Sequence, residues 1–91
     1  MGRPEIDKLR FKAGDAATFY FRDIEWSNLP VKSPATKAWD LPDTACGIVM
    51  YRPGDTMDGL YERAVDAVTA IVGWRIKKAS WTVINSGRPP R

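Results

Sequence analysis

The sequence predicts an α+β fold, a two-layer sandwich in which one long helix packs on a mainly antiparallel sheet of three or four strands. Three observations carry this prediction. Two runs of alternating apolar and polar residues flank a turn at Gly14 and Asp15. Apolar residues recur at helical spacing over 55–72, and short runs over 46–51 and 76–84 are typical of strands. The expected order of elements is β-β-loop-β-α-β.

The first two strands, over 9–12 and 17–26, are expected to form a β-hairpin around a glycine-containing turn. Each strand alternates apolar and polar side chains, so that one face of the hairpin is apolar and the other is polar. In the second strand the apolar positions change from odd to even numbers after Phe21. This change predicts a β-bulge near Arg22 or Asp23.

Over 27–44 the periodic pattern disappears, and three prolines favour a long loop. Loops of this length inside a small domain are more often functional than idle, and aromatic side chains in them are frequent binding anchors. Trp39 is therefore a candidate partner-binding residue. The apolar run over 46–51 then predicts a buried strand, which Pro53 and Gly54 end.

The helix is expected to run from Asp55 to Val72. Asp55 is a suitable N-cap residue, and Gly73 stands where a glycine commonly ends a helix. The face predicted to pack on the sheet contains Leu60, Ala64, Val68 and Ile71. A final strand over 76–84, rich in β-branched and aromatic residues, completes the sheet.

The whole chain, 1–91, is expected to form a single small domain with irregular tails over about 1–7 and 86–91. No apolar run approaches the length of about 18 residues that suggests a membrane span, so we expect no membrane contact. The N-terminal segment lacks the apolar stretch of a signal peptide. Together with a single cysteine, this predicts a cytoplasmic protein.

Histidine is absent from the sequence, and Cys46 is its only cysteine. Triads of the Ser-His-Asp or Cys-His type therefore cannot form, and neither can metal sites that contain histidine. We expect no enzymatic activity, no catalytic residue, no bound metal and no cofactor.

The predicted helix carries an acidic stripe opposite its apolar face, made of Asp55, Asp58, Glu62 and Asp66. We interpret this stripe as a solvated surface, which is the usual meaning of such a charge run. A basic partner surface is an alternative. A hard cation is another, although the spacing lacks the alternate carboxylates of a calcium loop.

The polar face of the predicted hairpin is basic and contains an aromatic side chain. With two residues from the last strand, it supplies the candidate partner-binding residues: Arg10, Lys12, Tyr20, Arg22, Lys77 and Trp81. Such a face suits an acidic protein surface, and it equally suits the phosphates and bases of a nucleic acid. A merely solvated sheet face is the third interpretation, because Lys and Arg are common outward residues.

The function we predict is non-enzymatic protein binding, as a small inhibitor, an adaptor or a subunit of a larger assembly. Phages and accessory genes encode small inhibitors of this kind, which block a host or defence complex. The alternative is nucleic-acid binding through the basic, aromatic sheet face. The formal net charge of +3 permits a polyanionic partner without requiring one.

Overall fold

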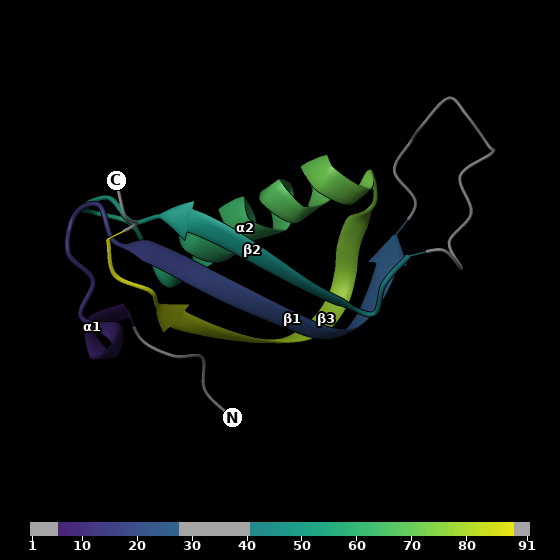
Figure 1. Ribbon diagram of the computed structural model, residues 1–91, viewed down its shortest axis with the longest axis horizontal. Helices are drawn as coiled ribbons and strands as arrows, with labels where there is room; N and C mark the ends of the chain where they lie inside the picture. The colour runs from purple at the N-terminus through teal and green to yellow at the C-terminus, as the bar shows by residue number, and fades with distance from the viewer. Residues whose placement is uncertain (1–5, 28–40, 89–91) are drawn as a thin grey trace.

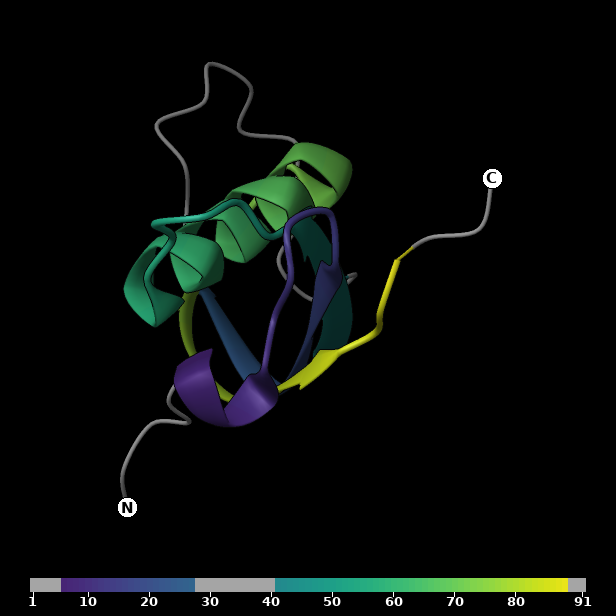
Figure 2. The same ribbon diagram turned by 90° about the vertical axis from the view of Figure 1, so that its left-hand side faces the viewer.

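The structure is a computed structural model that describes residues 6–27 and 41–88 (Figure 1). Its elements, in chain order, are α1 (Ile6–Leu9), β1 (Ala16–Ser27), β2 (Thr44–Met50), α2 (Met57–Val72) and β3 (Arg75–Asn85). The three strands form one antiparallel sheet in the order β2-β1-β3. α2 packs on one face of this sheet (Figure 2). The predicted α+β arrangement of one long helix on an antiparallel sheet is confirmed.

The core lies between α2 and the central strand β1. Ala17, Phe19 and Phe21 alternate along β1 toward the helix and are at most 1% exposed. Leu60 and Val65 of α2 pack against them and are at most 2% exposed. Burying a large apolar side chain contributes about 1.5–3 kcal/mol, so these few residues supply much of the stabilisation that a small domain can obtain.

The predicted bulge in β1 is confirmed. Pairing between β1 and β3 is regular up to Arg22, shifts between Arg22 and Glu25, and shifts again before Trp26. Asp23 has a left-handed backbone conformation, with φ of 53°. The irregularity reverses the alternation of the strand, so Trp26 packs against the same core as Phe21 although their numbers differ in parity.

The ends of α2 lie close to their predicted positions. The N-cap residue is Thr56, one residue later than expected, and its Oγ1 accepts a hydrogen bond from the Gly59 amide at 3.1 Å. Asp55 instead closes the preceding turn, where its Oδ2 accepts from the Arg52 amide at 2.8 Å. Gly73 ends the helix with φ of 78°, as predicted.

The first strand predicted over 9–12 is wrong. Leu9 is the last residue of α1, and Arg10 has φ of 52°, outside the range of a strand. Both edges of β1 are occupied, by β2 and by β3, so a further strand has no partner there. Phe11 still packs against the core, from the connection between α1 and β1. α1 also begins within the 1–7 segment that the sequence predicts to be irregular.

Side-chain hydrogen bonds fold this connection back on the end of β3. Asn85 donates through Nδ2 to the Leu9 carbonyl at 3.2 Å and to Asp15 Oδ2 at 3.1 Å. The same carboxylate oxygen accepts from the Lys12 amide at 2.8 Å. The polar residues near the turn thus satisfy backbone groups that a hairpin strand would have paired.

Two predictions of burial are also wrong. β2 is an edge strand that meets α2 on one side only, so Ile48 and Met50 are exposed on the other side. Ile71 is 80% exposed, whereas the rest of the predicted helix face, Leu60, Ala64 and Val68, is buried. Ile71 lies in the last turn of α2, where the helix and β2 diverge (Figure 1).

Candidate functional site

The sheet face opposite α2, which we call the open face, carries a cluster of exposed apolar side chains. The strand register places Thr18 of β1 opposite Ile48 of β2 and opposite Ile84 of β3. Directly paired residues point to the same side of a sheet, so all three belong to the open face. Tyr20 follows Thr18 by two residues in β1, and Met50 follows Ile48 by two residues in β2, so both share this face, on opposite sides of the Thr18–Ile48 pair.

Four of these side chains form what we call the open-face patch: Tyr20, Ile48, Met50 and Ile84. Their exposed fractions are 43%, 60%, 45% and 46% respectively. Thr18 lies between Ile48 and Ile84 and is only 4% exposed, with its Oγ1 2.5 Å from Ser86 Oγ. The patch therefore spans the three strands, and the hydroxyl of Thr18 at its centre is satisfied within the chain.

A shallow hollow adjoins the patch where β1 and β2 run beside each other. Its volume is about 410 Å³, and it is lined by Tyr20, Phe21, Arg22, Thr44, Ala45 and Cys46. Tyr20 belongs both to the hollow and to the patch. Arg22 is the only positively charged side chain in this lining, so the hollow combines apolar surface with one positive charge at its rim.

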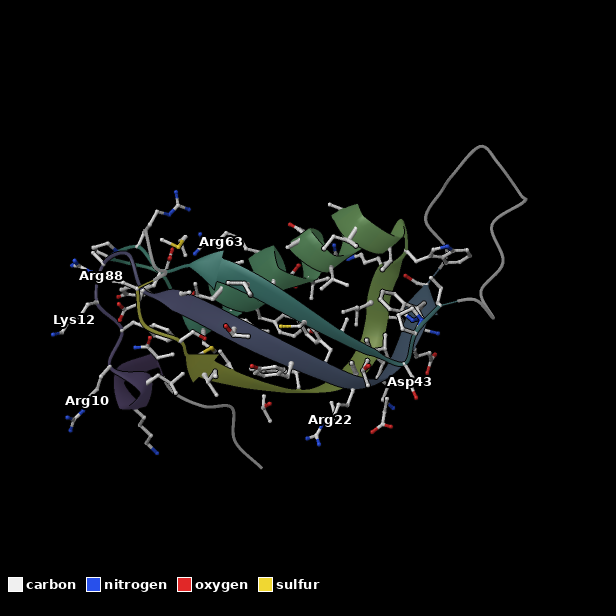
Figure 3. All side chains as sticks on the ribbon, in the orientation of Figure 1. Arg10, Lys12, Arg22, Asp43, Arg63 and Arg88 are labelled. Atoms are coloured by element: carbon white, nitrogen blue, oxygen red, sulfur yellow. The ribbon has the colours of Figure 1, made fainter. Side chains whose placement is uncertain are left out.

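Of the predicted basic face, the structure brings together Tyr20 and Arg22 only. Arg10 follows α1, and Lys12 lies in the turn that precedes β1. Figure 3 shows both at the α1 end of the molecule, away from Arg22. The prediction that the four side chains share one sheet face is wrong, because it required 9–12 to be a strand.

The two candidates from β3 are separated as well. Lys77 is exposed and its Nζ lies 3.1 Å from Glu25 Oε1. Trp81 pairs with Phe21 across the sheet and so faces α2, where its ring lies 5.4 Å from that of Phe19. The predicted placement of Trp81 on the outer face is wrong. Trp39, like most of the predicted loop over 27–44, lies outside the described residues.

A second hollow lies on the helix side of the sheet, between α2 and β3. Its volume is about 300 Å³, and it is lined by Asp58, Tyr61, Glu62 and Trp81. α2 lies closest to β2, where Gly47 allows its backbone to approach Ala64. The helix therefore covers the β3 side of the sheet less completely, and the rings of Tyr61 and Trp81 remain half-buried there.

Next to this hollow an arginine of the chain bridges two carboxylates of α2. Arg75 Nη2 lies 2.7 Å from Glu62 Oε1, and its Nη1 lies 2.8 Å from Asp66 Oδ1. The hydrogen bond to Asp66 and then that to Glu62 raise the pKa of the Arg75 guanidinium, against the opposing effect of its partial desolvation. Part of the predicted acidic stripe thus binds a cation of the same chain.

The described ranges show neither a metal centre nor a membrane helix. Within 6–27 and 41–88, no group of three or more His, Cys, Asp or Glu side chains could hold a metal ion. Cys46 is an exposed free thiol. No helix in the same ranges has the length and apolar character needed to cross a membrane.

Sequence reasoning missed the apolar character of the open face. A usable signal was present: Ile48 and Met50 in β2, and Ile84 in β3, alternate with the residues that face the core, so both faces of these strands are apolar.

Comparison of the chain with protein-family models, with curated proteins and with solved structures finds no match.

Proposed function

We propose that this protein is a non-enzymatic protein-binding module whose contact surface is the open-face patch. The observation that supports the proposal is the gathering of four exposed apolar side chains, one of them aromatic, on a single face of the sheet. Contiguous apolar surface on a small protein is costly to leave in water and commonly marks an interaction site. Of the five large exposed apolar side chains in the described ranges, only Ile71 lies elsewhere.

The chemistry of the surface defines the partner. The hollow beside Tyr20 has room for one apolar side chain of the partner to insert as an anchor. A carboxylate of the partner, next to that anchor, would form an ion pair with Arg22 at the rim of the hollow. This ion pair would fix the orientation of the complex and speed association. The partner is therefore a protein with an apolar patch and an acidic residue at its margin.

Site-specific photo-crosslinking in the source cell tests this proposal. A photoreactive phenylalanine analogue is placed at Ile48 or at Ile84, and a matched control places it at Ile71, which is more exposed but lies on α2. We expect one protein to crosslink at both sheet positions and not at Ile71. The recovered protein is then purified and titrated directly with the unmodified chain.

Other occupants of the open face give different results in the same experiment. Crosslinking only to a second copy of this chain would identify a homodimer and contradict the proposal of a distinct partner. Crosslinking to nucleic acid, with an affinity that falls steeply as salt rises, would support the alternative function. Equal crosslinking at Ile71 would show that contact is non-specific.

A further inference from the structure

We propose that an extended segment of the partner protein pairs with the free edge of β2 and adds a strand to the sheet. The strand order β2-β1-β3 leaves one edge of β2 without a neighbouring strand in the part of the chain that the structure describes. This inference rests on the proposed protein-binding function, because Ile48 and Met50 of the open-face patch belong to the same strand.

The backbone groups that face the free edge follow from the hydrogen bonds just beyond the two ends of β2. The Tyr51 amide donates to the Asp15 carbonyl at 2.8 Å. At the other end, the Asp43 carbonyl accepts from the Ile24 amide at 3.1 Å. Because the direction of backbone bonding alternates along a strand, the odd-numbered residues bond to β1 and the even-numbered residues point their N–H and C=O groups the other way. The residues whose backbone faces the free edge are therefore Thr44, Cys46, Ile48 and Met50.

The two edges of the described sheet differ in the features that normally prevent pairing with a further strand. β2 contains no charged residue and no proline, and its register with β1 has no irregularity. β3 carries Arg75, Lys77 and Lys78 in its first half, beside the irregular part of its pairing with β1. At its other end, Asn85 is bonded to the connection that follows α1. Charges, irregular pairing and covering segments protect strand edges, so β2 is the edge that accepts a strand.

The side chains of β2 define the chemistry of the added segment. Residues that pair directly point to the same side of a sheet, so every second residue of the segment lies on the open face beside Ile48 or Met50. We expect these residues of the segment to be apolar or aromatic. The segment lacks proline where its backbone bonds to β2, and its length matches the seven residues of that strand.

The extent of the patch favours a separate partner over a second copy of this chain. Tyr20 lies on β1 and Ile84 on β3, both farther from the free edge than Ile48. A second copy paired through β2 would continue the sheet in its own plane and leave both side chains exposed. A partner that adds one strand and continues across the open face would cover them.

The probe for the test is a library of random seven-residue peptides displayed on phage and selected against the unmodified chain, to match the length of β2. Hydrogen exchange of the chain is then measured by NMR with and without the selected peptides. We expect enriched peptides with alternating apolar residues. They should slow exchange of the Cys46 and Ile48 amides about tenfold or more, and leave the Gly47 and Val49 amides, which already bond to β1, nearly unchanged.

Two matched variants locate the contact on the backbone of β2. Cys46→Pro removes an amide that faces the free edge, whereas Cys46→Ala removes the same side chain and keeps the amide. Proline is tolerated on an edge strand where its nitrogen faces solvent, so both variants should fold. We expect Cys46→Pro to weaken binding of the selected peptides about tenfold or more, since its ring also lies in the path of the added strand, and Cys46→Ala to bind them like the unmodified chain.

Three results would overturn this inference. The first is that no peptide is enriched, and the second is that peptides bind without alternating protection and bind Cys46→Pro equally well. Both leave the open-face patch to be tested by crosslinking at Ile48 and Ile84, so failure of the edge is distinguishable from failure of the proposed function. The third is slowed exchange of the same amides as the concentration of the chain alone rises, which would assign the edge to a second copy. If Cys46→Pro does not fold, the alternation of protection on the unmodified chain decides.

Discussion

Gly47 of β2 lies so close to Ala64 of α2 that a Cβ atom on Gly47 would be 2.8 Å from the Ala64 carbonyl oxygen and 3.2 Å from its Cβ. The nearest obstacle is a backbone atom inside a helix, which cannot turn aside as a flexible side chain can. This contact holds α2 against β2, and the hollow with Tyr61 and Trp81 remains on the β3 side. The glycine at this position thus allows α2 to lie nearer to β2 than to β3.

Gly47→Ala is expected to destabilise the protein, because α2 must move away from β2 to make room for the methyl group. Overpacking of this kind costs about 1–3 kcal/mol. Urea unfolding followed by circular dichroism measures the change. Cys46→Ala is the matched control: Cys46 is the exposed neighbour, so this substitution should change the free energy of unfolding by less than about 0.5 kcal/mol. Equal effects of the two substitutions would contradict the close packing at Gly47.

Leu60→Ala and Ile71→Ala should differ sharply in stability, although both residues lie on the predicted apolar face of α2. Leu60 is fully buried, so its truncation should cost about 2–5 kcal/mol. Ile71 is 80% exposed, and Ile71→Ala should change the free energy of unfolding by about 0.5 kcal/mol or less. Chemical denaturation of both variants checks the difference, and a large loss for Ile71→Ala would place the end of α2 against the core.

Asp15→Asn should make folding stability less dependent on pH in the acid range. The hydrogen bond from the Lys12 amide and then that from Asn85 lower the pKa of Asp15 below 3.8. Lys12 and Arg88 act in the same direction as nearby positive charges. A carboxylate with a lowered pKa stabilises the fold fully above its unfolded pKa, and this contribution is lost as the pH falls through the folded pKa.

The measurement is the midpoint of urea unfolding between about pH 5 and pH 2.5 for the wild type and for Asp15→Asn. Below pH 3.8 the midpoint of the wild type should fall more steeply than that of the variant. The unfolding midpoint of the variant should still depend on pH to some extent, because the pKa of Asp55 is also lowered. Burial raises the pKa of Asp55, but the hydrogen bonds from the Arg52 amide and the Arg63 guanidinium together outweigh that effect. Identical slopes would show that Asp15 loses these hydrogen bonds in solution.

The sequence predicted the elements whose pattern is long, and it failed where short segments depend on tertiary partners. The helical periodicity that includes Leu60 and the parity change beyond Phe21 are local patterns, so α2 and the bulge were predictable. The run over 9–12 alternates like a strand, yet the edges of β1 are occupied by strands from elsewhere in the chain. Nothing local to that run contains this information.

The candidate site was harder to predict because it depends on which face of each strand meets the helix. Trp81 and Lys77 seemed equivalent along the last strand, but the register with Phe21 turns Trp81 toward α2. The run over 46–51 was predicted to be buried because its residues are apolar, whereas a single helix covers only one face of the sheet and leaves Ile48 exposed. The exposure of Ile48 and Ile84 follows from their register with Thr18, which places both on the face away from α2.

The affinity of the crosslinked partner for open-face variants tests the proposed function most directly. Ile48→Thr combined with Ile84→Thr removes apolar surface while keeping the β-branched shape that strands favour. Ile71→Thr is the matched control on α2. All variants should remain folded, since each replaced side chain is between 46% and 80% exposed. We predict that the double variant binds about tenfold or more weakly, as loss of interface anchors does, and that Ile71→Thr binds like the wild type. Unchanged affinity of the folded double variant would contradict the proposal that the open-face patch is the binding surface.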